Sequence, residues 1–223
     1  MKSTKEKPIL FSTPMVQSIL SGRKTMTRRF VKPRPDLDSE PSLIVRGLAN
    51  ERDWGKWYYD SPEGETIVRG CPYGQPGDIL WVRETQAKIF TPDGEFSHYA
   101  YKADNDPLHA GIKWKQSIFM PRKACRIRLV ITEVRVERLQ DISEEDTVNE
   151  GIDSWVEERL LSKPTRYKCY ADFDNPKDPA TYCSNPVDSF QSLWQSINGA
   201  ESWDANPWVW VIAFKKTDSF LSE

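Results

Sequence analysis

Residues 125–139, C-R-I-R-L-V-I-T-E-V-R-V-E-R-L, carry the strongest β-strand pattern in the chain. Apolar residues occupy alternate positions over residues 127–131, which is typical of a strand with one buried face. Val134 and Val136 resume the alternation after a shift of one residue. Such a shift predicts a β-bulge or bend, which strands use to curve around a barrel.

Weaker patterns on both sides of this strand predict the remaining elements. Further strands are expected at residues 8–12, 24–31 (after an initial turn), 79–83, 96–102 and 208–214. Helices are expected at residues 13–21, 143–151, 153–161 and around 190–197. Long strands with short helices between them predict an α+β fold built on a β-barrel, and periodicity alone leaves an open α+β sheet as the alternative.

The length of 223 residues suits one well-buried domain. Residues 32–76 contain many prolines and three short β-like runs, at 43–46, 56–59 and 66–69. Residues 162–188 have a loop-like composition. Since neither segment has enough periodic apolar positions for its own core, we interpret both as insertions in a single domain spanning residues 1–223.

The composition excludes some classes of protein. A formal net charge of -2 argues against a protein that coats nucleic acid non-specifically, although residues 23–34 form a local basic site. No window resembles a signal peptide or a membrane span, so a cytoplasmic protein without membrane contact is expected. Four dispersed cysteines without C-x-x-C spacing predict reduced thiols, with a metal site at Cys169 and Cys183 together with His98 or His109 as the minor alternative.

The segment Gly22–Arg29, G-R-K-T-M-T-R-R, is the main candidate for chemistry. A helix that ends at Gly22 is followed at once by Lys24, then by the hydroxyl of Thr27 and by Arg29. On the residues alone, a solvated basic turn is the favoured interpretation.

The pattern G-x-K-x-x-(E/T)-x-R after a short helix resembles the signature of the ASCH superfamily, relatives of the PUA domains. Gly77-Asp78-Ile79-Leu80 is similar to the strand entry of that family, and residues 208–214 are similar to its closing strand. The stretches YGQPGDILWVRET, SIFMPRKACRI, ERLQDISEEDTVNEGI and SWDANPWVWVIAF resemble ASCH proteins common in phages and prophages. The resemblance covers most of the chain and implies a PUA-like β-barrel around a pocket for RNA or a modified nucleoside.

Thr27 occupies the position where most members of the superfamily carry glutamate. This variant resembles the small bacterial N4-acetylcytidine amidohydrolases, and the resemblance implies that Lys24, Thr27 and Glu150 are catalytic. Amide hydrolysis needs a nucleophile, a proton acceptor and an oxyanion donor. Thr27 would attack or position a water, and Lys24 would act as base if burial lowers its pKa, or as oxyanion donor if Glu150 holds it charged.

Two geometric conditions apply to this prediction. Lys24 and Thr27 converge only if Lys24 still lies in the turn before the strand, because residues three apart face opposite sides of a strand. Glu150 is expected in the last turn of its helix, where the macrodipole disfavours a carboxylate, so a surface position is its alternative.

Five other residues are predicted to contact the substrate. They are Arg29, Arg83, Glu84, Arg122 and Asn206. Arg29 would contact a phosphate or ribose, or else brace the barrel through a salt bridge. For the other four a purely structural role is at least as well supported.

Two functions remain open at the level of the sequence. The first is an amidohydrolase that removes an acyl group from N4 of a cytosine nucleoside or nucleotide. The second is a non-catalytic module that binds RNA or a modified nucleobase. No cofactor, metal or obligate protein partner is expected in either case.

Overall fold

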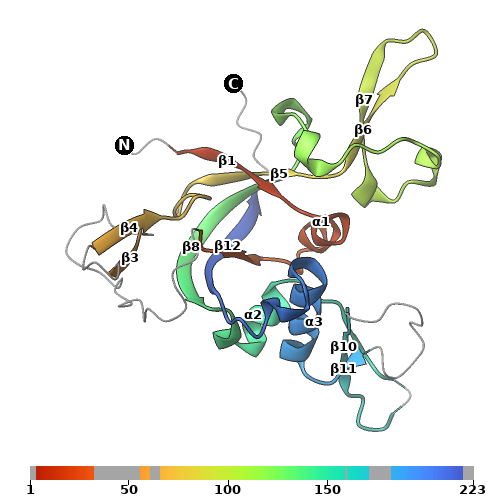
Figure 1. Ribbon diagram of the computed structural model, residues 1–223. Coiled ribbons are helices and arrows are strands. Elements are labelled where there is room, and N and C mark those ends of the chain that lie inside the picture. Colours follow the sequence, from red (N-terminus) through yellow and green to blue (C-terminus); the bar gives the residue numbers. More distant parts are fainter. Residues whose placement is uncertain (1–3, 33–55, 61–65, 159, 171–181, 218–223) are drawn as a thin grey trace.

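A five-stranded sheet with the order β1–β5–β8–β12–β2 forms the centre of the molecule in the computed structural model (Figure 1). Its strands are β1 (Glu6–Leu10), β5 (Ile79–Arg83), β8 (Arg128–Arg138), β12 (Trp208–Thr217) and β2 (Met26–Phe30). β1 runs parallel to β5, and the other neighbours are antiparallel. The structure describes residues 4–32, 56–60, 66–158, 160–170 and 182–217.

Within the described residues, three α-helices and three smaller sheets surround the central sheet. The helices are α1 (Thr13–Leu20), α2 (Glu144–Asn149) and α3 (Pro186–Asn198). The hairpins are β3 (Lys56–Asp60) with β4 (Thr66–Gly70) and β6 (Gln86–Phe90) with β7 (Phe96–Tyr101). A third sheet has the order β11 (Tyr182–Cys183), β10 (Thr165–Lys168), β9 (Ser154–Val156). All three project from the central sheet in different directions (Figure 1).

The predicted bulge in β8 is confirmed. Ala213 of β12 lies opposite Glu133, whereas the next residue, Phe214, lies opposite Ile131. Thr132 is therefore the extra residue, at the position where the apolar alternation shifts. The bulge lets the apolar side chains on both sides of Thr132 face the same core.

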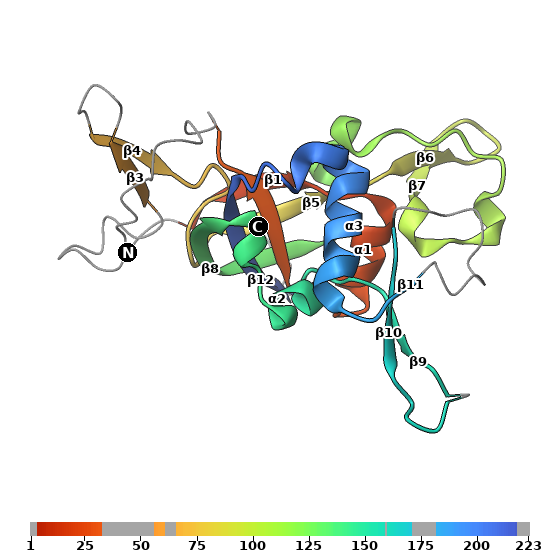
Figure 2. The same cartoon turned by 60° about the horizontal axis from the view of Figure 1, so that its bottom comes forward.

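The two faces of β12 bury different clusters. Trp210, Ile212 and Phe214 pack with residues of α1, among them Val16 and Ile19. The alternate residues Val209 and Val211 pack with residues of α3, among them Phe190 and Trp194. α1 and α3 lie side by side over one end of the sheet (Figures 1 and 2). Because both faces are covered, the first seven residues of β12 are all apolar instead of alternating with polar ones.

The α+β class is confirmed, but none of the sheets formed by the described residues closes into a barrel. The edges of the central sheet are β1 and β2. A side chain connects them, since Arg29 Nη2 of β2 donates a hydrogen bond to the Leu10 carbonyl of β1 at 2.6 Å.

Two predictions about local structure are wrong. The helix predicted at 153–161 is not formed, because Ser154–Val156 pairs instead with residues 165–167 as the strand β9. The segment 162–188 is not all loop, because it contains β10, β11 and the first turn of α3, which starts after the Asn185 cap. The run predicted at 43–46 lies outside the described residues. No helix in the described part of the chain has the length and apolar character needed to span a membrane.

Candidate active site

Lys24 lies in the turn between α1 and β2, as the predicted convergence requires. α1 ends at Leu20 and Gly22 has a φ of 76°, a left-handed conformation that glycine adopts without strain. The Lys24 N–H then donates to the Ser18 carbonyl at 3.0 Å, and β2 begins only at Met26. The turn thus places Lys24 under the end of α1 instead of on the strand.

The end of α2 packs directly against this turn. Gly151, with a φ of 84°, follows the helix, and a Cβ at this position would lie 2.7 Å from Lys24 Cβ. Ser18 Oγ donates to the Gly151 carbonyl at 3.2 Å, and the Thr25 N–H donates to the Asn149 carbonyl at 2.8 Å. The glycine therefore permits the close approach that brings Glu150 to Lys24.

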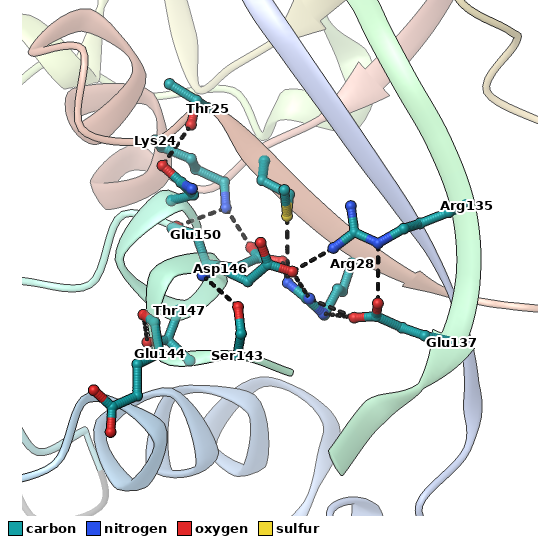
Figure 3. Close-up of polar contacts among 12 residues, drawn as sticks. Lys24, Thr25, Arg28, Arg135, Glu137, Ser143, Glu144, Asp146, Thr147 and Glu150 are labelled. Atoms are coloured by element: carbon teal, nitrogen blue, oxygen red, sulfur yellow. Dashed lines mark hydrogen bonds and ion pairs between the residues drawn. The ribbon is translucent and has the colours of Figure 1, made fainter. Parts of the chain in front are cut away.

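Lys24 and Glu150 form a buried ion pair (Figure 3). Lys24 Nζ lies 2.7 Å from Glu150 Oε2 and 2.8 Å from the Glu150 carbonyl oxygen. The two side chains are 1% and 5% exposed. Burial lowers the pKa of Lys24 from its ordinary value of 10.5, and the Glu150 carboxylate opposes this shift.

The ion pair is part of a larger charged network that sequence reasoning missed. Three cations alternate in this network with three anions. The cations are Lys24, Arg28 and Arg135, and the anions are Glu150, Asp146 and Glu137. Arg28 is the centre of the network (Figure 3) and its side chain is 0% exposed. Its guanidinium lies 2.5 Å from Glu137, 2.7 Å from Asp146 and 3.3 Å from Glu150 Oε1. Glu150 is thus held by a cation on each carboxylate oxygen.

The spacing of these residues along the chain does not predict this network. Arg135 and Glu137 both lie on β8, where they alternate with Val134 and Val136, a pattern that gives no sign of an ion-pair network. Ser143 and Asp146 have the spacing of a helix-capping box. Ser143 Oγ does accept from the Asp146 N–H, but the Asp146 carboxylate pairs with Arg28 and Arg135.

A pocket of about 100 Å³ lies along the edge of β2 that faces away from β12. Its lining comes from α1, β2, α3 and the end of α2: Met15, Thr27, Arg28, Arg29, Phe30, Glu150, Phe190, Leu193, Trp194, Ile197 and Asn198. Thr27 and Glu150 therefore meet at one pocket, and Thr27 is only 2% exposed. Lys24 is not among the lining residues but lies behind Glu150.

The lining from α3 was also missed as a site. The apolar spacing of residues 190–197 predicts an amphipathic helix but gives no sign of a pocket. Phe190 and Trp194 do belong to a core cluster, and they contribute at the same time an aromatic wall beside Phe30. The Phe30 and Trp194 rings meet edge to face with centroids 5.0 Å apart.

Of the five predicted contact residues, Arg29 lines the pocket. Its guanidinium also lies over the Phe11 ring, 5.3 Å from the centroid, in addition to bonding the Leu10 carbonyl. The bracing role considered for Arg29 is therefore present in the structure, although its partner is a main-chain carbonyl and not a carboxylate.

The other four predicted contact residues make structural contacts away from this pocket. Glu84 is 1% exposed and forms a two-pronged pair with Arg126, with both distances at 2.9 Å. Burial raises the pKa of Glu84, and Arg126 opposes that shift. Arg83 donates to the Ile118 carbonyl, Arg122 pairs with Glu6, and Asn206 Oδ1 accepts from the Gln140 N–H at 2.9 Å.

Within the described residues, no three His, Cys, Asp or Glu side chains gather as a metal site would require. Cys71, Cys125, Cys169 and Cys183 are free thiols. The lining of the pocket includes a hydroxyl, a carboxylate, two guanidinium groups and the Asn198 amide, which suit hydrogen bonding and proton transfer. Comparison of the chain with protein-family models, with curated proteins and with solved structures finds no match.

Proposed function

We propose that this chain is an ASCH-type protein of PUA-like architecture that hydrolyses the N4-acyl amide of a cytosine nucleoside or nucleotide. The observation that carries the proposal is the meeting of Thr27 and Glu150 at one pocket, with Lys24 paired to Glu150. The octet that contains Lys24, Thr27 and Arg29 resembles the family signature. The approach of β1 to β2 through Arg29 supports the curvature that a PUA-like barrel needs.

The pocket suits the reacting end of such a substrate. A volume of about 100 Å³ is well above the roughly 10–15 Å³ that a single water needs. This space admits an acylated ring edge, and the ribose lies outside it. The side chains of Met15, Phe30 and Phe190 offer apolar surface to a ring, whereas Thr27 and Glu150 offer polar groups to the amide.

The reaction consists of acylation of Thr27, through a tetrahedral intermediate, followed by hydrolysis of the acyl ester. Thr27 Oγ attacks the acyl carbonyl, and its proton passes to the Lys24–Glu150 pair. The tetrahedral intermediate then breaks its C–N4 bond, and the proton returns to N4 as cytidine leaves. Water finally cleaves the acyl ester on Thr27 and releases the carboxylic acid.

The two charged residues have different parts in this reaction. Glu150 lines the pocket and exchanges the proton with the substrate, whereas Lys24 exchanges it with Glu150 across 2.7 Å. A lowered pKa makes the Lys24 amine a better proton acceptor near neutral pH than a free lysine. Lys24 does not line the pocket, which argues against the alternative that it stabilises the oxyanion directly.

A chromatographic assay with N4-acetylcytidine tests the proposal. Wild type should release cytidine, and Lys24→Ala and Thr27→Ala should not. Arg122→Ala is the matched control, since Arg122 pairs with Glu6 away from the pocket, and should retain activity. Absence of cytidine release at micromolar enzyme would contradict the proposal.

A binding role is the second candidate function. The observation that favours it is the complete enclosure of Lys24, whose amine already has two acceptors from Glu150. Binding of N4-acetylcytidine without release of cytidine, measured by calorimetry on the same samples, would establish this function instead.

A further inference from the structure

Alternate residues of β2 form main-chain hydrogen bonds with β12, and Arg28 is not one of them. Its main-chain N–H and C=O therefore point to the pocket side of the strand. The Val31 N–H donates to the Trp208 carbonyl at 3.0 Å, and the Phe214 N–H donates to the Thr25 carbonyl at 2.8 Å. In an antiparallel ladder, bonded pairs alternate with non-bonded pairs. Thr27 and Arg29, opposite Ile212 and Trp210, therefore bond to β12, whereas the N–H and C=O of Arg28 point away from it.

The exposed fractions of Arg28 agree with this orientation of its main chain. Arg28 as a residue is 4% exposed, and its side chain is 0% exposed. The accessible surface of Arg28 therefore belongs to its main chain, and Arg28 lines the pocket. Across the described part of the chain, no hydrogen bond is found for either main-chain group. Unpaired main-chain groups in such enclosed places are uncommon in folded proteins, and a ligand is one way to satisfy them.

We propose that the main-chain N–H and C=O of Arg28 are the recognition edge of this pocket. They bind a planar ring that presents an acceptor and a donor side by side, as N3 and the N4–H of cytosine do. This inference rests on the proposed function for the identity of the ring, and it adds the groups that select it. The side chain of Arg28 is fully used by Glu137, Asp146 and Glu150, so the main chain alone performs the recognition.

The occupant is a small ring and not an added peptide strand. Strand addition needs a row of free main-chain groups along an edge. Here α3 lies across the edge of β2, and its Phe190, Trp194 and Ile197 enclose the pocket around Arg28. One main-chain donor and one main-chain acceptor beside the apolar side chains of α3 match one heterocyclic edge.

Amide hydrogen exchange of the full-length ¹⁵N-labelled protein, followed by NMR, tests this inference with cytidine as the probe. In the free protein the Arg28 N–H should exchange faster than the N–H groups of Thr27 and Arg29. Saturating cytidine should slow the exchange of the Arg28 N–H by about tenfold or more, which one added hydrogen bond supplies. N4,N4-dimethylcytidine and 3-methylcytidine, which lack the donor and the acceptor, should bind about tenfold more weakly than cytidine.

The inference is overturned if saturating cytidine leaves the exchange of the Arg28 N–H unchanged, or if this N–H is as protected as its neighbours in the free protein. Equal binding of cytidine and its methylated analogues also overturns it. Because the exchange measurement requires no turnover, its result is separate from the hydrolysis assay. Protection without hydrolysis would reject the proposed reaction alone, and hydrolysis without protection would reject the recognition edge alone.

Discussion

Glu150→Gln should destabilise the protein more than Lys24→Met, although each substitution breaks the same buried pair. When Lys24 becomes methionine, the Glu150 carboxylate keeps Arg28 as a charged partner. When Glu150 becomes glutamine, the Lys24 ammonium keeps no anion at hydrogen-bond distance and retains only the main-chain carbonyl and an amide oxygen. The network therefore predicts an asymmetry between two variants of similar size.

The burial of the pair sets the magnitudes. Removing one partner of a buried ion pair costs about 3–5 kcal/mol, and we expect this for Glu150→Gln. Lys24→Met leaves the Glu150 carboxylate still paired with Arg28, so we expect the free energy of unfolding to fall by only about 1–3 kcal/mol. For a chain of this size the larger loss lowers Tm by about 6–20 °C. The double variant should lose at least about 1 kcal/mol less than the sum of the two.

The pH dependence of the Glu150→Gln variant follows from the lowered pKa of Lys24. At pH values between the folded-state pKa of Lys24 and 10.5, Lys24 is protonated in the unfolded chain but not in the folded protein. The free energy of unfolding therefore rises with pH over this range. Without the opposing carboxylate of Glu150 the folded-state pKa falls further and the window widens. The stability deficit of the variant should therefore shrink as the pH rises from neutral towards 10.5.

Urea unfolding of wild type, both single variants and the double variant, at two pH values, measures all these quantities. Equal losses for the two single variants would refute the asymmetry. If the stability loss of the double variant equals the sum of the two single losses, the ion pair itself is refuted. A deficit that grows with pH would show that Lys24 is not the group left unpaired.

Three further outcomes are expected. Gly151→Ala should lower the free energy of unfolding by about 1–3 kcal/mol, because φ is 84°, and should reduce cytidine release, because the new Cβ displaces Lys24. Gly77→Ala, which has a similar φ of 91° but open space around the new Cβ, should leave release unchanged at a temperature where it is folded. Glu84→Gln should cost about 3–5 kcal/mol in urea unfolding by breaking the Arg126 pair, with cytidine release unaltered at a temperature where it is folded. The rate of cytidine release by wild type should rise with pH and level off below the ordinary lysine pKa of 10.5, because burial lowers the pKa of Lys24.

Local sequence patterns predicted those parts of the fold that depend on neighbours in the chain. The phase shift at Thr132 predicted the β8 bulge, and the cap signals around Gly22 and Gly151 predicted where two helices end. These two helix ends place Lys24 and Glu150, so the central pair of the site was predictable once each turn was located. Thr27 followed from the family resemblance and not from periodicity.

Contacts between distant segments were not predictable in the same way. The pattern at 153–161 favoured a helix, but pairing of Ser154–Val156 with β10 forms a strand instead. Arg28 was interpreted as part of a solvated turn, because nothing local indicates that Glu137 and Asp146 surround it. Glu84 follows a buried strand as a pocket residue often does, yet Arg126 neutralises it in the structure.

Replacement of the Thr27 hydroxyl tests the central claim most directly. Thr27→Ser keeps an attacking oxygen, whereas Thr27→Val keeps the shape and removes it. In the N4-acetylcytidine assay, Thr27→Ser should retain measurable cytidine release and Thr27→Val should lose at least about 100-fold relative to wild type. Release by Thr27→Val at close to the wild-type rate would contradict the assignment of this pocket as a hydrolytic site built on Thr27.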